Sequence, residues 1–582
     1  LQLDSAAFYN FKHITFQSTA TTNYATEITL ANKTRFITID SCSFIAAANT
    51  STDGHINQQS FNGTDSNFVI TNNKFKGGNY GIKMTAANGL IKGNAFENMG
   101  GSGTVVAMEL TGGANSYLII DSNFVRNPIV CTFLSGGICY SFGTNPISGI
   151  RLTSGTGANC DITVTRNKIY AQGSAFSSSS QGTPLKPIKV YNNFFGGKET
   201  VVAVSGWYHD FYNNTIADSA NNTNNSLVRI DNSNINFRNN ILAKRVTTPN
   251  QFSRLIEFSN NFFVSTFTSS NNAYFIEDST KTIYNGTTNL TLSAWKALGK
   301  DANSKTITPA FISYFSDLHI DKNKAGAVDV FKAAVPLAAI PKDIDDSTRS
   351  LTVPSIGADE FSLNDNDGGA IAITNLGTPV AQGANNIVAS IRNYGNNNIT
   401  AASINWSVNN VAQTPYAWTG NIATGDSATN INIGNFNFTG VLKYDIKIWT
   451  SIAGDVNAVN DTAFKSVYPA LCGNYTIAGL TPDFSTLAAA AKYASFAGVS
   501  CPVVFNIRDG VYNEADTINF IPGASAINTV TFQSQSLDSS KVQFTQSASF
   551  IGANTIAVLT LNTAQHIKFK AIAFKRVADP LY

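Results

Sequence analysis

Charge is scarce in this sequence. Of the 582 residues, 13% are Asp, Glu, Lys or Arg, and the formal net charge is +2. An average globular protein has roughly 25% of these residues. The near-neutral balance excludes the basic surface by which proteins bind nucleic acid or acidic membranes. No run approaches the roughly 18 apolar residues of a membrane-spanning helix, so no membrane span is expected. Aromatic residues make up 11% of the chain, which argues against disorder.

Lys and Glu, which favour helices, are replaced by Asn, Thr, Ser and Gly. Thr favours strands, and the other three residue types favour turns. This replacement predicts an all-β, extracellular protein.

The two ends of the sequence resemble each other. LQLDSAAFYNFKHITF at 1–16 aligns without gaps on LTLNTAQHIKFKAIAF at 559–574, an offset of 558 residues from Leu1 to Leu559. One interpretation is that a tandem unit ends and its next copy begins. The alternative is two similar strands of a single fold.

Residues 1–265 contain a shorter repeat, φ-x-x-N-x-φ, where φ is apolar. A period in the twenties suits one turn of a parallel β-helix, with three strands and three bends per turn. Asn tolerates the left-handed conformation at a bend, and its amide can bond the next Asn along the axis. We therefore expect a structural ladder, not a ligand site. Its members are Asn73, Asn94, Asn123, Asn167, Asn193, Asn214, Asn240 and Asn261.

Catalysis in a β-helix would need carboxylates on adjacent turns of one face. The residue after the first φ of each repeat should form one column, and Asp40 and Asp121 in it lie three turns apart, on the order of 14 Å. We expect Arg166 and Lys168 to be solvated surface groups, and the scattered histidines to be neither ligands nor bases. No enzyme is predicted. The full column reads Lys12, Asp40, Thr71, Lys92, Asp121, Thr165, Tyr191, Tyr212, Arg238 and Ser259.

Six cysteines fit an oxidising compartment. Cys131 and Cys139 flank a Gly-Gly turn, and Cys472 and Cys501 flank a candidate helix, so both pairs are predicted disulfides. Cys42 and Cys160 lie several turns apart. They exceed the roughly 7 Å Cα separation that a disulfide allows, so we expect both to be free.

After a polar linker at 362–369, the pattern changes to two-residue alternation in about seven short strands, which predicts an antiparallel β-sandwich over 362–469. Trp406 and Trp449 are expected in its core. Residues 470–582 should begin a second β-helix. Its open end would be covered by a short helix over 486–496, with Asp483 and Ser485 as candidate caps.

Two oxygen-rich segments flank the predicted sandwich. They contain the candidate calcium ligands Asp365 and Asp367 on one side and Asp455 and Asp461 on the other. Such clusters can bind Ca²⁺ and stiffen a rod, and polar turns have the same composition. No other cofactor is expected.

Several motifs carry a family resemblance. LTLSAWKALGKDANSKTITPAF (290–311) with SDLHI (316–320), and DIDDSTRSLTVPSIGADEF (343–361), resemble the closing segments of right-handed parallel β-helices of the pectate-lyase-like superfamily. LCGNYTIAGLTPDFSTLAAAAKYAS, continued by CPVVFNIRDGVYNEA (471–515), resembles their opening segment. More specifically, the chain resembles the giant, tandemly repeated secreted proteins of Bacteroidota, which implies a cell-surface localisation. Asp346 replaces the usual Gly of the closing signature, and Pro354-Ser355 stands where Pro-Asp is common.

This resemblance implies three domains: a parallel β-helix at 1–361, with its N-terminal part missing or supplied by a preceding repeat, an immunoglobulin-like adhesion domain at 362–469, and the start of the next helix at 470–582. Five segments match the Asp-Ser/Thr-apolar pattern of O-glycosylation in Bacteroidota. The hydroxyls concerned are those of Ser5, Ser219, Ser427, Thr462 and Thr517.

The favoured function is a structural and adhesive repeat of a long extracellular filament, stalk or adhesin. Its expected partners are neighbouring repeats, identical chains in a fibre, and a cell-surface or glycan ligand. One alternative is a carbohydrate-active β-helix enzyme, a polysaccharide lyase or glycoside hydrolase. Another is a glycan-binding module that uses exposed aromatics such as Tyr191 and Tyr212.

Overall fold

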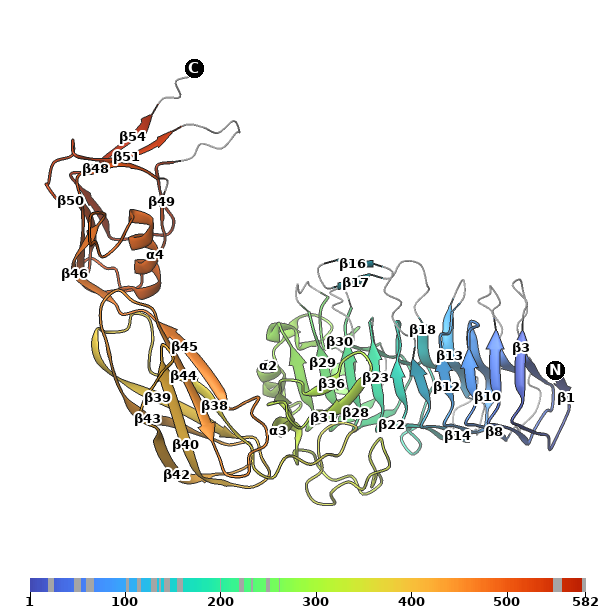
Figure 1. The fold of residues 1–582 in the computed structure, drawn as a ribbon. Helices are drawn as coiled ribbons and strands as arrows, with labels where there is room; N and C mark the ends of the chain where they lie inside the picture. Colours follow the sequence, from blue (N-terminus) through green and yellow to red (C-terminus); the bar gives the residue numbers. More distant parts are fainter. Residues whose placement is uncertain are drawn as a thin grey trace. The chain divides into compact units, whose positions relative to one another are not determined.

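The computed structural model is all-β, with 51% of residues in strands and 6% in helices. It divides into two compact units, Leu1–Leu363 and Asn364–Tyr582 (Figure 1). The residues described are 1–18, 26–46, 54–58, 67–100, 104–112, 117–126, 133–135, 138–140, 147–153, 161–198, 200–218, 225–231, 234–246, 252–260, 262–514, 516–547 and 557–577.

The first unit is a parallel β-solenoid, which confirms the predicted β-helix. Successive strands fall in three different sheets, and each strand pairs in parallel with the strand three places on, because one turn contributes one strand to each sheet. A short hairpin, β16 (Phe133–Ser135) and β17 (Ile138–Tyr140), lies outside this stack.

The first sheet contains β1 (Gln2–Asp4), β4 (Ile28–Ala31), β7 (Gly54–Gln58), β10 (Tyr80–Ala87), β13 (Val105–Gly112), β18 (Ile147–Thr153), β21 (Phe176–Ser178), β24 (Val202–Val204), β27 (Val228–Ile230), β30 (Ile256–Phe258), β33 (Ile283–Tyr284) and β34 (Asn289–Leu290). The second contains β2 (Asn10–Lys12), β5 (Ile37–Asp40), β8 (Phe68–Thr71), β11 (Gly89–Lys92), β14 (Tyr117–Asp121), β19 (Asp161–Thr165), β22 (Ile188–Tyr191), β25 (His209–Tyr212), β28 (Ile235–Arg238) and β31 (Phe267–Ser270). The third contains β3 (Thr15–Ser18), β6 (Ser43–Ala46), β9 (Lys74–Lys76), β12 (Ala95–Glu97), β15 (Phe124–Arg126), β20 (Lys168–Tyr170), β23 (Phe194–Gly197), β26 (Thr215–Asp218), β29 (Ile241–Lys244), β32 (Ala273–Ile276) and β35 (Lys305–Thr306).

A buried asparagine ladder runs along the first unit. The amide of Asn167 donates to the side-chain oxygen of Asn193 at 2.9 Å and to the carbonyl of Ile120 at 2.9 Å. The same bonds recur from Asn73 to Asn240. The left-handed residue is the one before each ladder asparagine, such as Arg166 (φ 54°), and not the asparagine itself, which corrects that part of the sequence interpretation.

The ladder ends differently from the prediction. Asn240 bonds Asn272 at 3.2 Å, so Asn272 takes the next step; Asn261 itself lies outside the described residues. A helical turn, α1 (Phe262–Ser265), precedes β31 and displaces the register. Ser270 therefore replaces Ser259 as the partner of Arg238 in the outer column.

A buried carboxylate, Asp301, closes the ladder. It accepts hydrogen bonds from the amide of Asn272, the hydroxyl of Tyr274 and the indole of Trp295 at 2.8–3.0 Å. Trp295 lies in α2 (Leu292–Ala297), which follows the short helix η1 (Ser279–Lys281).

Residues 307–361, here named the return segment, then run back along the outside of the solenoid. The segment contains β36 (Phe311–Ser313), β37 (Asp317–Ile320) and α3 (Ala327–Val330). Gly357 donates to the carbonyl of Asn239, and Leu318 donates to the hydroxyl of Tyr170, 69 residues further back on the solenoid strands. The return segment thus spans several turns.

The second unit begins with two antiparallel sheets around one apolar core. Trp406 is 3% exposed and lies in that core. Trp449 is half-buried, with Lys447 over its ring at 5.2 Å, so its expected core position is wrong. Alternation along β44 turns Ile446 and Ile448 inward and Trp449 outward. The strands are β38 (Gly368–Ile373), β39 (Gly383–Asn393) and β43 (Ser427–Phe438) in one sheet, and β40 (Ile399–Val408), β41 (Val411–Ala412), β42 (Tyr416–Ile422), β44 (Tyr444–Ser451) and β45 (Thr462–Val467) in the other.

Parallel strands resume at Leu471. The helix α4 (Leu487–Ala497) lies between the first two of these strands in the sequence. The cap of α4 is Thr486, whose hydroxyl accepts from Ala489, and not Asp483 or Ser485. Asp483 instead accepts two bonds from Thr476. The three sheets here are β46 (Leu471–Ile477), β47 (Val499–Ile507), β50 (Val530–Ser534) and β53 (Ile567–Lys570); β48 (Gly510–Asn513), β51 (Val542–Ser547) and β54 (Ala573–Val577); and β49 (Asp516–Ile518) and β52 (Leu559–Leu561).

Candidate functional site

The closing signature of the return segment is held together by Arg349 and Asp343. The buried guanidinium of Arg349 donates to the carbonyls of Gly357 and Ala358, both at 2.8 Å. One oxygen of Asp343 accepts the N–H groups of residues 345 and 347, and the other accepts that of Glu360. These buried bonds fix the backbone that carries Asp345 and Asp359.

Gly357 brings this backbone close to the solenoid. Its φ is +97°, and an added Cβ would lie 2.6 Å from Ile241 Cδ1. A side chain at this position would therefore push the return segment away from β29.

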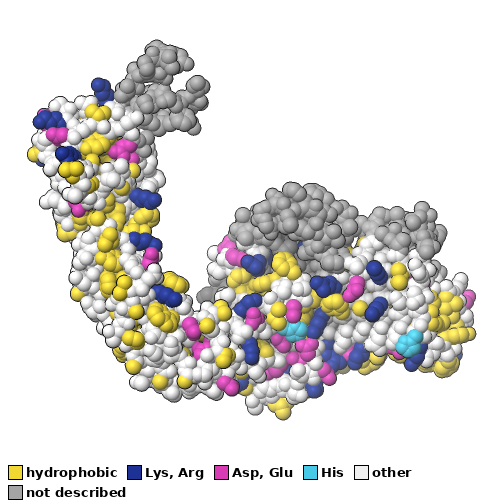
Figure 2. All heavy atoms as spheres, viewed as in Figure 1, with side chains coloured by type: hydrophobic (Ala, Val, Ile, Leu, Met, Phe, Trp, Pro, Cys, Tyr) yellow, Lys and Arg dark blue, Asp and Glu magenta, His cyan; other side chains and the backbone are white. Residues whose placement is uncertain are grey.

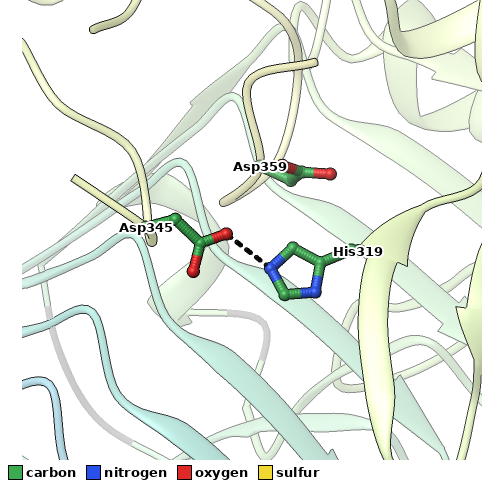
Figure 3. Close-up of side chains that lie close together, drawn as sticks. All are labelled: His319, Asp345 and Asp359. Atoms are coloured by element: carbon green, nitrogen blue, oxygen red, sulfur yellow. Dashed lines mark hydrogen bonds and ion pairs between the residues drawn. The ribbon is translucent and has the colours of Figure 1, made fainter. Parts of the chain in front are cut away.

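A cluster around His319 lies where β37 meets residues 343–361, here named the signature loop (Figure 3). The Nδ1 atom of His319 contacts a carboxylate oxygen of Asp317, and its Nε2 lies 2.7 Å from Asp345 Oδ2. Lys168 of β20 bonds the other oxygen of Asp345 at 2.6 Å. Asp359 is 8% exposed and accepts the N–H of Ile320 at 2.9 Å.

Charge pairing sets the titration of this cluster. The hydrogen bond from His319, followed by that from Lys168, lowers the pKa of Asp345. Burial by itself lowers the pKa of His319, but the hydrogen bonds with Asp345 and Asp317 reverse this and raise it. Burial raises the pKa of Asp359. The arrangement can hold a proton or another cation between His319 and its carboxylates.

A second ion-paired group adjoins it. Arg166 donates to both oxygens of Asp121 at 2.8 and 2.7 Å and also pairs with Asp346 of the signature loop. Figure 2 shows acidic and basic side chains gathered around a histidine on this face of the first unit. Arg166 and Lys168 are therefore ion-paired and not solvated surface groups, which corrects the prediction: the return segment supplies Asp346 to Arg166 and Asp345 to Lys168.

The sequence interpretation missed this cluster because its members are far apart. Lys168 precedes His319 by 151 residues, and His319 precedes Asp345 by 26. The motifs SDLHI and DIDD contain Asp317, His319 and Asp345, but their resemblance to closing segments of β-helices indicates only a fold. A column of residues on the solenoid alone could not contain ligands that come from a crossing segment.

The two predicted calcium segments converge on Asp367 in the second unit. Its oxygens accept amide N–H bonds from Asn457 at 2.9 Å and Asn460 at 2.7 Å, while Asp455 accepts the N–H of Gly368. Asp461 accepts a bond from Thr450, and burial followed by the charge of Asp455 raises its pKa to about 6. Asp365 is exposed, and its backbone carbonyl bonds Asn397.

The other predicted sites are dispersed. Cys472 and Cys501 form a disulfide with Cα atoms 4.9 Å apart, and Cys42 is free and buried. The side chains of Cys131, Cys139 and Cys160 lie outside the described residues, as does Ser219. Tyr191 and Tyr212 are half-buried, not exposed. The remaining glycosylation candidates are Ser5, Ser427 and Thr517, which are exposed, and Thr462, which is half-buried.

Tyr191 lines a small groove beneath residues 339–342 of the return segment, together with Thr165, Arg166 and Asn192. The groove lies beside the ion pair of Arg166 with Asp346.

Searches of family models, curated proteins and solved structures return no match to this chain. Among the residues that the structure describes, no helix has the length and apolarity needed to span a membrane.

Proposed function

We propose that this chain is a structural and adhesive repeat of an extracellular filament, stalk or adhesin. The observation that carries the proposal is the equivalence of two turns. Residues 1–18 and 557–577 each contain three short strands at matching positions: β1, β2 and β3 in one, and β52, β53 and β54 in the other.

The bends of the two turns also match. Left-handed residues recur at the same 558-residue offset, as Ser5 and Thr563 (φ 50° and 57°), then Phe8 and His566 (64° and 58°), and His13 and Ala571 (54° and 52°). Non-glycine residues adopt this conformation uncommonly, so three coincident positions support one repeated structure and not two similar strands.

The apolar contacts repeat as well. Phe11 and Phe16 meet edge to face with ring centroids 6.4 Å apart, and Phe569 and Phe574 do so at 5.5 Å. On this proposal, a further β-helix of the first kind follows the turns at 471–577, the β-sandwich is an immunoglobulin-like spacer, and α4 covers the end of the helix. The number of tandem units would then set how far the end of the filament lies from the cell.

Surface chemistry suits side-by-side association of such units. Few charges and a net charge of +2 give little repulsion between identical chains, and Asn, Thr and Ser can bond across an interface. Closed cyclic symmetry is the common arrangement for identical chains. The disulfide between Cys472 and Cys501 fits an oxidising, extracellular setting.

Electron microscopy of the native protein tests the proposal. We expect a multi-stranded filament with a longitudinal repeat set by the 558-residue unit. Isolated single rods would contradict the side-by-side association of chains but would remain compatible with a stalk. Compact particles without periodicity would contradict the filament.

The carbohydrate alternatives need separate assays. We expect no turnover of pectin or alginate, with or without Ca²⁺; turnover would favour a β-helix enzyme. Binding on a glycan array that is lost in Tyr191→Ala would favour the glycan-binding module, because Tyr191 lines the groove under the return segment.

A further inference from the structure

We propose that His319, Asp345 and Asp359 form a binding site for a divalent transition-metal ion such as Zn²⁺. Each residue offers one ligand atom, and the three atoms lie within 4.8 Å of one another. A tetrahedral zinc site has metal–ligand bonds of about 2.0–2.2 Å, which places ligand atoms about 3.3 Å apart. Small side-chain rotations would close the site, and Asp345 is free to make one because its side chain is 44% exposed.

The imidazole is already oriented as a metal ligand. Asp317 holds the Nδ1 side of the ring, and this directs Nε2 toward Asp345. A carboxylate on the far nitrogen is the usual support of a metal-bound histidine, since it fixes the tautomer and the ring. The ring of Phe194 packs edge-on against the imidazole with centroids 4.7 Å apart and further restricts its rotation.

A bound metal takes the place of the Nε2 proton, because a ligand imidazole is neutral and presents a lone pair there while Nδ1–H stays donated to Asp317. That lone pair and Asp345 Oδ2 are then two acceptors 2.7 Å apart. Without metal, the Nε2 proton lies between them as the hydrogen bond from His319 to Asp345. A metal ion satisfies both acceptors at once and also neutralises the nearly buried carboxylate of Asp359.

Local charge favours a divalent ion over the single cation already present. Asp317, Asp345 and Asp359 supply three carboxylates, whereas Lys168 supplies one ammonium within 2.6 Å of Asp345 and 3.4 Å of His319 Nε2. Lys168 would compete with the metal and turn toward solvent when the metal binds. The imidazole nitrogen selects a transition metal over Ca²⁺ or Mg²⁺, which prefer oxygen ligands alone.

Bound metal would join parts of the return segment that are 26 and 40 residues apart, from His319 to Asp345 and Asp359. It would clamp β37 to the signature loop and hold both against β20. The role is structural, and it does not depend on the proposed filament.

The test uses the full chain stripped with a chelator and titrated with Zn²⁺, Co²⁺, Ca²⁺ and Mg²⁺ by calorimetry. We expect one Zn²⁺ per chain, weaker or no binding of Ca²⁺ and Mg²⁺, and visible absorption of bound Co²⁺ typical of nitrogen and oxygen ligands. His319→Gln and Asp345→Asn should each weaken Zn²⁺ binding at least tenfold, and Asp317→Asn by about tenfold or more.

Two further variants separate this site from general surface charge. Asp346→Asn removes a neighbouring carboxylate of the same loop that pairs with Arg166, and it should leave binding unchanged. Lys168→Met removes the competing ammonium and should strengthen binding. Circular dichroism checks that each variant is folded. Absence of Zn²⁺ binding by the parent chain, undiminished binding by His319→Gln, or equal weakening by Asp346→Asn would overturn the proposal.

Discussion

The two units of this chain differ in the polar side chains that they place away from solvent. The first unit buries a column of neutral amides, in which each asparagine bonds the next. The second unit gathers carboxylates: Asp367 is 1% exposed, its charge contributes to the raised pKa of the half-buried Asp455, and the charge of Asp455 contributes to the raised pKa of Asp461. The amide column is self-complementary and can be extended indefinitely, whereas the acidic cluster belongs to one place and responds to pH.

The ends of the first unit show the limit of the ladder. An amide column needs a partner at each end, and Cys42 N–H supplies the donor at the beginning. In the first turn and in its equivalent at 557–577, Ile14 and Ile572 occupy the ladder position of the repeat. Among the parallel strands at 471–577, aromatic rings stack from strand to strand, such as Phe505 on Phe532 and Phe532 on Phe569.

Breaking the ladder in its middle should have the largest effect. Asn167→Ala removes the oxygen that accepts the backbone N–H and the amide of Asn123, and it removes the amide that donates to the Ile120 carbonyl. The backbone N–H of Asn123 and the carbonyl of Ile120 then lack these partners, while the Asn193 oxygen keeps the backbone N–H of residue 167. Each unsatisfied buried group costs about 1–3 kcal/mol, so we expect a loss of about 4 kcal/mol in unfolding free energy. Denaturant titration measures it.

Asn303→Ala is the matched control, because Asn303 is exposed on the same unit. It should change stability by less than about 0.5 kcal/mol. A loss of similar size in both variants would show that the ladder bonds carry no special stability.

The periodic part of the fold could be predicted from sequence because it is local. Each φ-x-x-N-x-φ repeat encodes its own inward side chains and bend, so seven of the eight predicted ladder members occupy it. After Asn240 the ladder continues through Asn272, because α1 changes the spacing and a fixed repeat cannot anticipate a helical turn; the eighth predicted member, Asn261, lies outside the described residues.

Reducing the disulfide should have the next largest effect, confined to the second unit. Cys472 and Cys501 are separated by 29 residues. Closing a loop of this length stabilises a fold by about 3 kcal/mol in the chain-entropy model. We expect the Cys472→Ser, Cys501→Ser double variant to lower the unfolding transition of residues 471–577 and to leave the ladder unit unchanged, as followed by hydrogen exchange. Loss of protection in both units would contradict their independence.

A smaller loss should follow from replacing the carboxylate that ends the ladder. Asp301→Asn keeps the shape but replaces one acceptor with a donor, opposite the Trp295 and Tyr274 donors or the Asn272 amide. One such mismatch costs about 2 kcal/mol. Thermal unfolding of the variant measures it. The control is Asp321→Asn. The Asp321 carboxylate accepts the backbone N–H of Asn323 at an exposed turn, and its replacement should cost under about 1 kcal/mol.

The candidate site was beyond sequence reasoning for a physical reason. The positions of Lys168 and Arg166 on the solenoid followed from the repeat, but their partners come from the return segment, whose path depends on tertiary bonds such as that of Gly357 with Asn239. A pattern predicts which face a side chain occupies, and it does not predict which distant segment covers that face.

The smallest expected effect concerns the acidic cluster and pH. Burial and Asp455 raise the folded-state pKa of Asp461 from 3.8 to about 6. The protonated form is therefore favoured by folding, and this contribution is fully present below pH 3.8 and lost as pH rises to about 6. Because Asp461 is only half-buried, solvent screening reduces the effect to about 1 kcal/mol.

Asp461→Asn keeps the oxygen that accepts from Thr450 and cannot ionise. We expect it to match the parent chain at pH 3.5 and to be the more stable by about 1 kcal/mol at pH 7, in denaturant titrations of the second unit. The amide ladder has no titrating group, so Asn167→Ala should cost the same at both pH values. If the unfolding free energies of the parent chain and of Asp461→Asn differ by the same amount at both pH values, pH does not distinguish the acidic cluster from the amide ladder.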